Sequence, residues 1–123
     1  MRRFSLIVLI ALCSCSRSPQ AVNRDAIDDA IGKADFLAAK FLIGNPDARF
    51  LKAKQNFQLG MRHASTSSMG QASSNAFQSI FSDEVLRIII VLDNTGDRPK
   101  AKEIQGEALG LMKSTNIENA ITP

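Results

Sequence analysis

Apolar residues recur three and four positions apart along most of the chain, which is the spacing of one face of an α-helix. The first such stretch runs from Ala26 to Leu42, with Gly44 after it as a left-handed stop. Its apolar positions are Ala26, Ile27, Ala30, Ile31, Ala34, Leu37, Ala38, Phe41 and Leu42. The pattern predicts one continuous helix over 26–42.

A second helix is predicted from Asn45-Pro46, where asparagine supplies an N-cap and proline suits the first turn. Its apolar stripe is weaker and consists of Phe50, Leu51, Phe57, Met61 and Ala64. Only two or three residues separate this helix from the first one. Such a short connection favours an antiparallel helical hairpin.

The next segment, 65–74, has six serines or threonines among its ten residues, which predicts a flexible loop. Helical spacing resumes at Asn75 and continues to Leu92. The β-branched run from Val85 to Leu92 also suits a buried strand. Helix is favoured there, because no partner strand appears elsewhere and an isolated strand leaves its edges unpaired.

A last long helix is predicted from Asp97 and Pro99 onward. Gly106 and Gly110 lie four residues apart on it, which indicates a site of close helix packing. Together the four stretches predict an all-α protein, a small irregular four-helix bundle built from two helical hairpins.

The beginning of the chain has a different character. Arg2 and Arg3 precede a short apolar run, Phe4 to Leu12, and then small residues. That run is too short to span a membrane, which takes about 20 apolar residues. Basic start, apolar core and small residues are the parts of a cleaved secretory signal.

The residues Leu12-Cys13-Ser14-Cys15 resemble the lipobox of bacterial lipoproteins, with an aliphatic residue three before the cysteine and a small one just before it. The resemblance implies cleavage before Cys15 and attachment of acyl chains to it, a durable membrane anchor. It also implies a cell-envelope location facing the periplasm. Ser16, in place of the aspartate that retains many lipoproteins at the inner membrane, mildly favours the outer membrane.

The expected organisation is a signal peptide at 1–14, a lipidated cysteine and tether at 15–23 and a helical domain at 24–123. Plain export with cleavage near Ser14-Cys15-Ser16 is the alternative, while a redox pair of Cys13 and Cys15 is disfavoured by its place at the edge of the signal. The whole chain has 15 Lys and Arg against 12 Asp and Glu, and removing Arg2 and Arg3 leaves 13 against 12. A nearly neutral domain lacks the broad basic surface of a nucleic-acid binder, so no nucleic-acid partner is expected.

The segment 82–116 resembles one tetratricopeptide unit, which would imply peptide or protein binding. The matching positions are Val85, Ile88, Leu92, Gly96, Ala101 and Ala108. The segment departs from the family at Ile89, where a small residue is usual, and at Gln105, where an aromatic is usual. No second copy lies at the 34-residue period, although such repeats normally need about three units to bury their faces. A generic helix pair explains the pattern equally well.

Few residues suggest catalysis. The single histidine, His63, suits a solvated helix end, and the acidic Asp25, Asp28 and Asp29 suit the first turn of a helix better than a cation site. Three serines, Ser65, Ser67 and Ser68, lack the surroundings of a nucleophile. No metal-ligand, phosphate-loop or dinucleotide pattern is present, so neither cofactor nor enzymatic activity is expected.

The basic residues of the second helix are expected on its solvated face, with contact to anionic lipid headgroups as the alternative. They are Arg49, Lys52, Lys54 and Arg62. The expected function is a binding or assembly component with an envelope protein as partner. Two alternatives stay open: a bundle that holds an acyl chain or small ligand against Phe50, Phe57, Phe77 and Phe81, and a hydrolase using His63 with two carboxylates.

Overall fold

The computed structural model describes residues 19–121, with side chains described for 23–115. All regular structure in this part of the chain is helical, which confirms the all-α prediction. The helices are α2 (Pro19–Gly32), α3 (Phe36–Ile43), α4 (Pro46–Thr66), α5 (Gly70–Asn94) and α6 (Arg98–Ile121). Five helices therefore occupy the described residues, where the apolar spacing predicted four.

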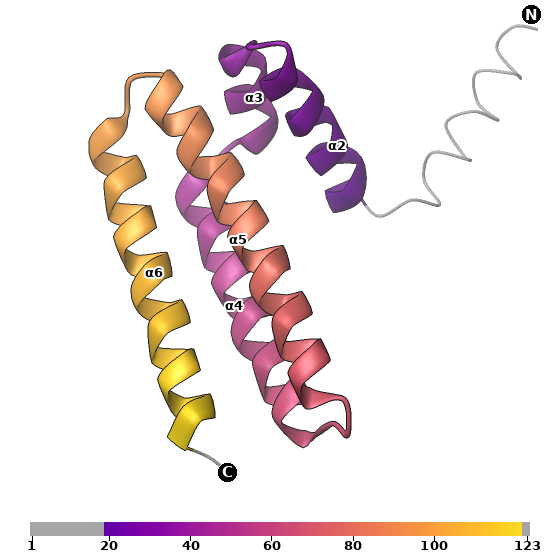
Figure 1. Cartoon of the computed structure of the whole chain (residues 1–123). Coiled ribbons are helices and arrows are strands. Elements are labelled where there is room, and N and C mark those ends of the chain that lie inside the picture. Colours follow the sequence, from indigo (N-terminus) through magenta and orange to yellow (C-terminus); the bar gives the residue numbers. More distant parts are fainter. Residues whose placement is uncertain (1–18, 122–123) are drawn as a thin grey trace, which may run out of the picture.

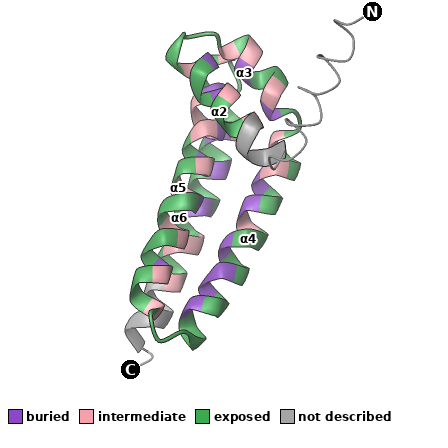
Figure 2. Ribbon diagram, turned by 90° about the vertical axis from the view of Figure 1, so that its right-hand side faces the viewer, coloured by how far each residue is buried: buried purple, intermediate pink, exposed green. Residues whose placement is uncertain are grey.

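Three long helices, α4, α5 and α6, run side by side with alternating direction, and the short α2–α3 hairpin leans against one end of them (Figure 1). Turning the molecule by 90° separates α4 from the α5–α6 pair, so that α5 stands at the corner between its two long neighbours (Figure 2). The main contacts agree with these views, since α5 contacts α4, α6, α3 and α2. Helix α5 is the central element of the fold.

The predicted helix over 26–42 is wrong in its continuity, because α2 ends at Gly32 and α3 begins at Phe36. Ala34 adopts a φ of 58°, which a helix interior does not allow. Asp35 then caps α3, its carboxylate accepting a hydrogen bond from the Ala38 N–H at 3.2 Å. The chain reverses here because both helices must bury apolar faces against α5, which a single straight helix could not do.

The caps predicted at the start of the second helix are confirmed. Gly44 has a φ of 71°, and the Asn45 side chain accepts hydrogen bonds from the Asp47 and Ala48 N–H groups at 3.0 and 3.3 Å. Pro46 occupies the first turn of α4. These local signals were readable from sequence because each acts within four residues.

The serine-rich loop predicted at 65–74 is wrong in its length, since α4 extends to Thr66 and α5 begins at Gly70. Ser67 closes the turn by accepting a hydrogen bond from the Met69 N–H at 3.2 Å. Ser74 lies buried in α5, with its hydroxyl 3.6 Å from the sulfur of Met61. Packing of α5 on α4 thus overrides the loop propensity of the serines.

The segment 85–92 is helical, as favoured, and lies within α5. The close packing predicted at Gly106 and Gly110 is wrong, because both glycines are exposed and nothing lies within 4 Å of a Cβ built on either. The small residues at which α6 is buried are Ala101 and Ala108. Those alanines lie on the buried face of α6, whereas the two glycines lie on its exposed face.

Two apolar clusters hold the helices together. The larger lies among α4, α5 and α6, and its largest members include Phe50, Phe57, Phe81 and Ile104. The smaller joins the α2–α3 hairpin to α5 through Ile27, Ala30, Ala39, Ile43 and Val91. Each fully buried large aliphatic or aromatic side chain contributes about 1.5–3 kcal/mol to folding.

The start of α2 at Pro19 places helix within the tether expected at 15–23. The expected signal peptide and Cys15 lie outside the described residues. Among the helices that the structure describes, none combines the length and the apolar character needed to cross a membrane.

Candidate ligand-binding groove

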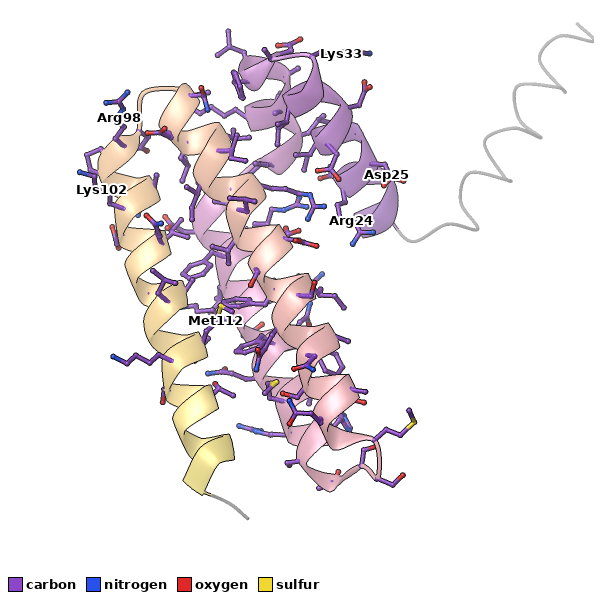
Figure 3. The ribbon with its side chains drawn as sticks, in the orientation of Figure 1. Arg24, Asp25, Lys33, Arg98, Lys102 and Met112 are labelled. Atoms are coloured by element: carbon purple, nitrogen blue, oxygen red, sulfur yellow. The ribbon has the colours of Figure 1, made fainter. Side chains whose placement is uncertain are left out.

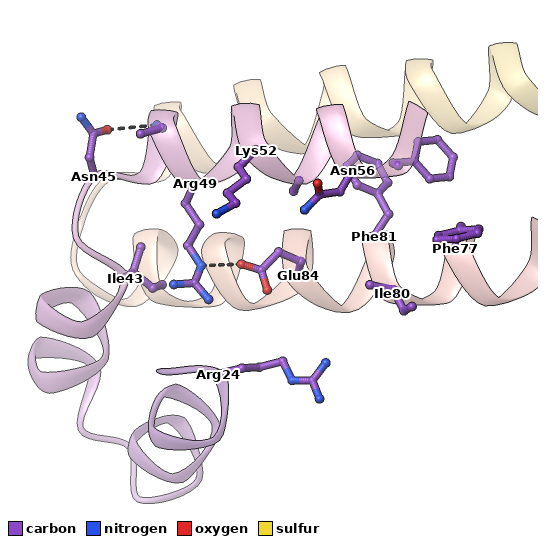
Figure 4. Close-up of a pocket in the computed structure, with 13 residues that line it drawn as sticks. Arg24, Ile43, Asn45, Arg49, Lys52, Asn56, Phe77, Ile80, Phe81 and Glu84 are labelled. Atoms are coloured by element: carbon purple, nitrogen blue, oxygen red, sulfur yellow. Dashed lines mark hydrogen bonds and ion pairs between the residues drawn. The ribbon is translucent and has the colours of Figure 1, made fainter. Parts of the chain in front are cut away.

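A groove of about 600 Å³ lies between α4 and α5, near the end that α2 approaches (Figure 4). This volume falls within the range of small-ligand sites, about 300–1,000 Å³. Helix α2 contributes Arg24, and α3 contributes Ile43. The remaining lining residues are Asn45, Ala48, Arg49, Lys52, Ala53, Asn56 and Phe57 before the turn, and Phe77, Ile80, Phe81 and Glu84 on α5.

The apolar part of the groove is built from aromatic rings. Phe57 and Phe81 stack with their ring centroids 4.5 Å apart and their planes 14° from parallel. Phe77 approaches α4 at Gly60, where an added Cβ would collide with the Phe77 ring. Ile80, at the mouth, is 57% exposed. Glycine at position 60 therefore lets the Phe77 ring lie directly on the backbone of α4.

The polar part of the groove is cationic. Arg49 and Lys52 project from α4, Arg24 comes from α2, and the amide of Asn56 lies beside the aromatic rings (Figure 4). Glu84 is the one carboxylate among the lining residues. Three cations against one anion leave this end of the groove with excess positive charge.

A chain of charged side chains joins α2, α4 and α5 beside the groove. Arg49 forms an ion pair with Glu84 and donates a hydrogen bond to the Asn23 side-chain oxygen at 2.7 Å. Arg87 lies 3.9 Å from the other Glu84 oxygen and binds both oxygens of Asp28, at 2.6 and 2.9 Å. Hydrogen bonding to Arg87 lowers the pKa of Asp28, and that carboxylate in turn raises the pKa of Arg87. Below we call Asn23, Asp28, Arg49, Glu84 and Arg87 the charge network.

The carboxylates near the groove are already paired within the charge network. Glu84 is shared between Arg49 and Arg87, and Asp28 is bound bidentately by Arg87. Among the described residues, Lys52 forms no ion pair or hydrogen bond, and Arg24 has only a long-range attraction to Asp28. Two cations in the groove therefore lack a close counter-charge.

The acidic cluster predicted in a first turn has a different role. Helix α2 begins at Pro19, so Asp25, Asp28 and Asp29 lie beyond its first turn. Asp28 binds Arg87, and Asp29 pairs with Lys33 at 2.9 Å. No group of three potential metal-ligating side chains occurs among the residues that the structure describes.

The residues considered for catalysis lie apart from the groove. His63 is exposed in the last turn of α4, as expected. Ser65 donates a hydrogen bond to the Arg62 carbonyl, and Ser67 holds the turn before α5. Ser68 is exposed in the same turn. Neither His63 nor any of these serines lines the groove.

The prediction of a solvated basic face holds for only half of its residues. Lys52 and Arg62 are exposed. Arg49 belongs to the charge network, and Lys54 pairs with Glu107 of α6 at 2.7 Å and lies 4.8 Å from the centre of the Phe50 ring. Sequence spacing could not show this, because the partners come from other helices.

The four phenylalanines considered for acyl-chain binding divide similarly. Phe57, Phe77 and Phe81 line the groove, but Phe57 and Phe81 are buried in the core, as is Phe50, whose ring lies 6.4 Å from that of Phe81. Of the four, only Phe77 is partly exposed. Sequence reasoning missed Arg24, Asn56 and Glu84, which lie on three different helices and form no motif. No family model, curated protein or solved structure matches this chain.

Proposed function

We propose that this protein is a lipid-anchored binding component of the cell envelope, with the α4–α5 groove as its ligand site. The lipobox-like residues before Cys15 support the anchor and the envelope location. One observation supports the binding role above all: a groove of ligand size that combines stacked aromatic rings with two cations lacking a close counter-charge.

The composition of the groove favours binding over catalysis. Guanidinium and ammonium groups supply fixed positive charge, and the asparagine amides supply neutral hydrogen bonds. The lone carboxylate, Glu84, is already held by Arg49 and Arg87. Such a set recognises an anion and leaves no ready proton acceptor for general-base chemistry.

Site-specific photo-crosslinking in intact cells tests the ligand site. A benzophenone amino acid replaces Ile80 at the mouth of the groove or, as a matched control, Leu109 on α6. The two side chains are 57% and 60% exposed, and only Ile80 lines the groove. We expect a small-molecule adduct from position 80 and none from position 109, read as intact mass. Equal adducts at both positions would overturn the groove as the site.

The same mass spectra test the anchor. Protein purified from membranes is expected to begin at Cys15 and to have the added mass of acyl chains, which a Cys15→Ala variant lacks. An unmodified mass that begins near Arg17 would instead indicate plain export.

The envelope protein partner predicted from sequence remains a second candidate. Helix α3 presents Leu37 and Phe41 on its exposed side, and both are large apolar residues. A protein-sized adduct from the same amino acid placed at Leu37, with no small adduct from position 80, would favour this candidate over a small ligand.

A further inference from the structure

We propose that the α4–α5 groove binds a single-chain amphiphile with an anionic headgroup, either a carboxylate or a phosphate. This ligand class rests on the proposed function, because it occupies the same groove. The anionic headgroup lies at the Lys52 and Arg24 end, and the hydrocarbon chain lies along the phenylalanines.

The groove is polar at one end and apolar at the other, because α4 and α5 are antiparallel. Along α4, Arg49 and Lys52 precede Phe57 by one to two turns. Along α5 the order is reversed, so that Glu84 follows Phe77 by nearly two turns. Both helices therefore place charge at the α2 end and aromatic rings at the opposite end (Figure 4). An amphiphile is likewise polar at one end and apolar at the other.

The charge at the polar end selects an anion. Glu84 cannot neutralise Lys52 and Arg24, since its two oxygens already face Arg49 and Arg87. The amide of Asn56 points into the groove between the cations and the rings, where it can donate a hydrogen bond to a headgroup oxygen (Figure 4).

The apolar end accommodates one chain. From Lys52 to Gly60 is eight residues, a length of about 12 Å along a helix. Because α4 and α5 are in direct contact, the groove runs along their junction, and this short length suits one chain lying along it better than two side by side. Phe57 and Phe81 are the buried floor of this end, so a chain lying there would cover mainly the exposed Ile80 and the partly exposed Phe77, removing their apolar surface from water.

Binding of defined amphiphiles tests the proposal. The full chain with Cys15→Ala is purified without detergent and titrated with saturated carboxylates, monoalkyl phosphates and alcohols of equal chain length, below their aggregation concentrations. We expect affinity to rise about fourfold for each added methylene until the apolar end is filled. The series that binds with the higher affinity, carboxylates or monoalkyl phosphates, identifies the headgroup. Alcohols are expected to bind at least fivefold more weakly than the preferred anion.

Two lysine variants separate headgroup recognition from general charge. Lys52→Gln is expected to weaken anion binding about fivefold without changing alcohol binding. Lys102→Gln is the matched control, because Lys102 is exposed on α6 and does not line the groove (Figure 3). Equal effects of the two variants, or equal affinities for alcohols and anions, would overturn the anionic headgroup.

A steric variant tests the chain site. Gly60→Ala forces the Phe77 ring away from α4, so we expect the affinity plateau to shift to a different chain length. An unchanged plateau, or no binding by any amphiphile, would overturn the proposal. If a small-molecule adduct still formed at position 80 in cells, the binding role would stand and only this ligand class would fail.

Discussion

At the scale of single residues, the same side chain has opposite roles in different places. Phe81 is buried between Phe50 and Phe57, whereas Phe41 projects from α3 and is 86% exposed. Both fall on the apolar spacing of the sequence, because that spacing identifies a face without showing what covers it. Position 41 belongs to the helix segment whose direction changed at Ala34.

This contrast predicts two different stability effects. Phe81→Ala is expected to lower the free energy of unfolding by about 3–5 kcal/mol, because it removes a stacked ring from the core. Phe41→Ala is expected to change it by less than about 0.5 kcal/mol. Urea denaturation followed by circular dichroism measures both. A large loss from Phe41→Ala would mean that the ring is covered in solution.

At the scale of helices, the caps were predictable and the contacts were not. Asn45 and Gly44 were identified at the α3–α4 junction because capping acts between neighbours in the chain. The extents of α4 and α5 were not, because buried Ser74 is stabilised by Met61 on the facing helix. Gly106 and Gly110 on α6 wrongly predicted close packing, because their spacing does not show whether a neighbouring helix lies against them.

Two glycine substitutions should act in opposite directions. Gly106→Ala in the open middle of α6 is expected to raise the free energy of unfolding by about 1 kcal/mol, through higher helix propensity. Gly70→Ala is expected to lower it by about 1–3 kcal/mol, since its Cβ would lie 2.6 Å from the Ala64 carbonyl oxygen. Thermal unfolding of the two variants checks the signs. Destabilisation by Gly106→Ala would restore the close-packing interpretation.

At the scale of the whole molecule, the charge network connects the two apolar clusters. Asp28 and Asn23 belong to the hairpin side, and Arg49 lies on a helix of the main cluster. Arg87 on α5 holds Asp28 from 59 residues away in sequence. The network therefore sets the position of α2, and with it Arg24, relative to the groove.

The network predicts a pH-dependent stability. Because Arg87 lowers the pKa of Asp28 below 3.8 in the folded protein, the stabilisation is complete above that pH and is lost as pH falls through the folded value. Asp28→Asn is expected to lower the free energy of unfolding at pH 7 by about 1 kcal/mol, a small value because the carboxylate is half exposed.

Urea unfolding at pH 7, 5, 3 and 2 checks this expectation, with the exposed Asp25→Asn as the control. The difference between Asp28→Asn and the unsubstituted protein should shrink at pH 3 and 2. A difference that stays constant with pH would exclude the ionised Asp28 as its source.

The sequence by itself determined the helical class, the cap at Asn45 and the helical state of 85–92. These follow from apolar spacing and from hydrogen bonds within a few residues. Tertiary structure alone decided the reversal at Ala34, the pairing of Arg49 and Lys54, and the cations left facing the groove. The physical reason is range: each depends on partners from distant parts of the chain, which only the packing of α2 and α4 on α5, and of α6 beside them, brings together.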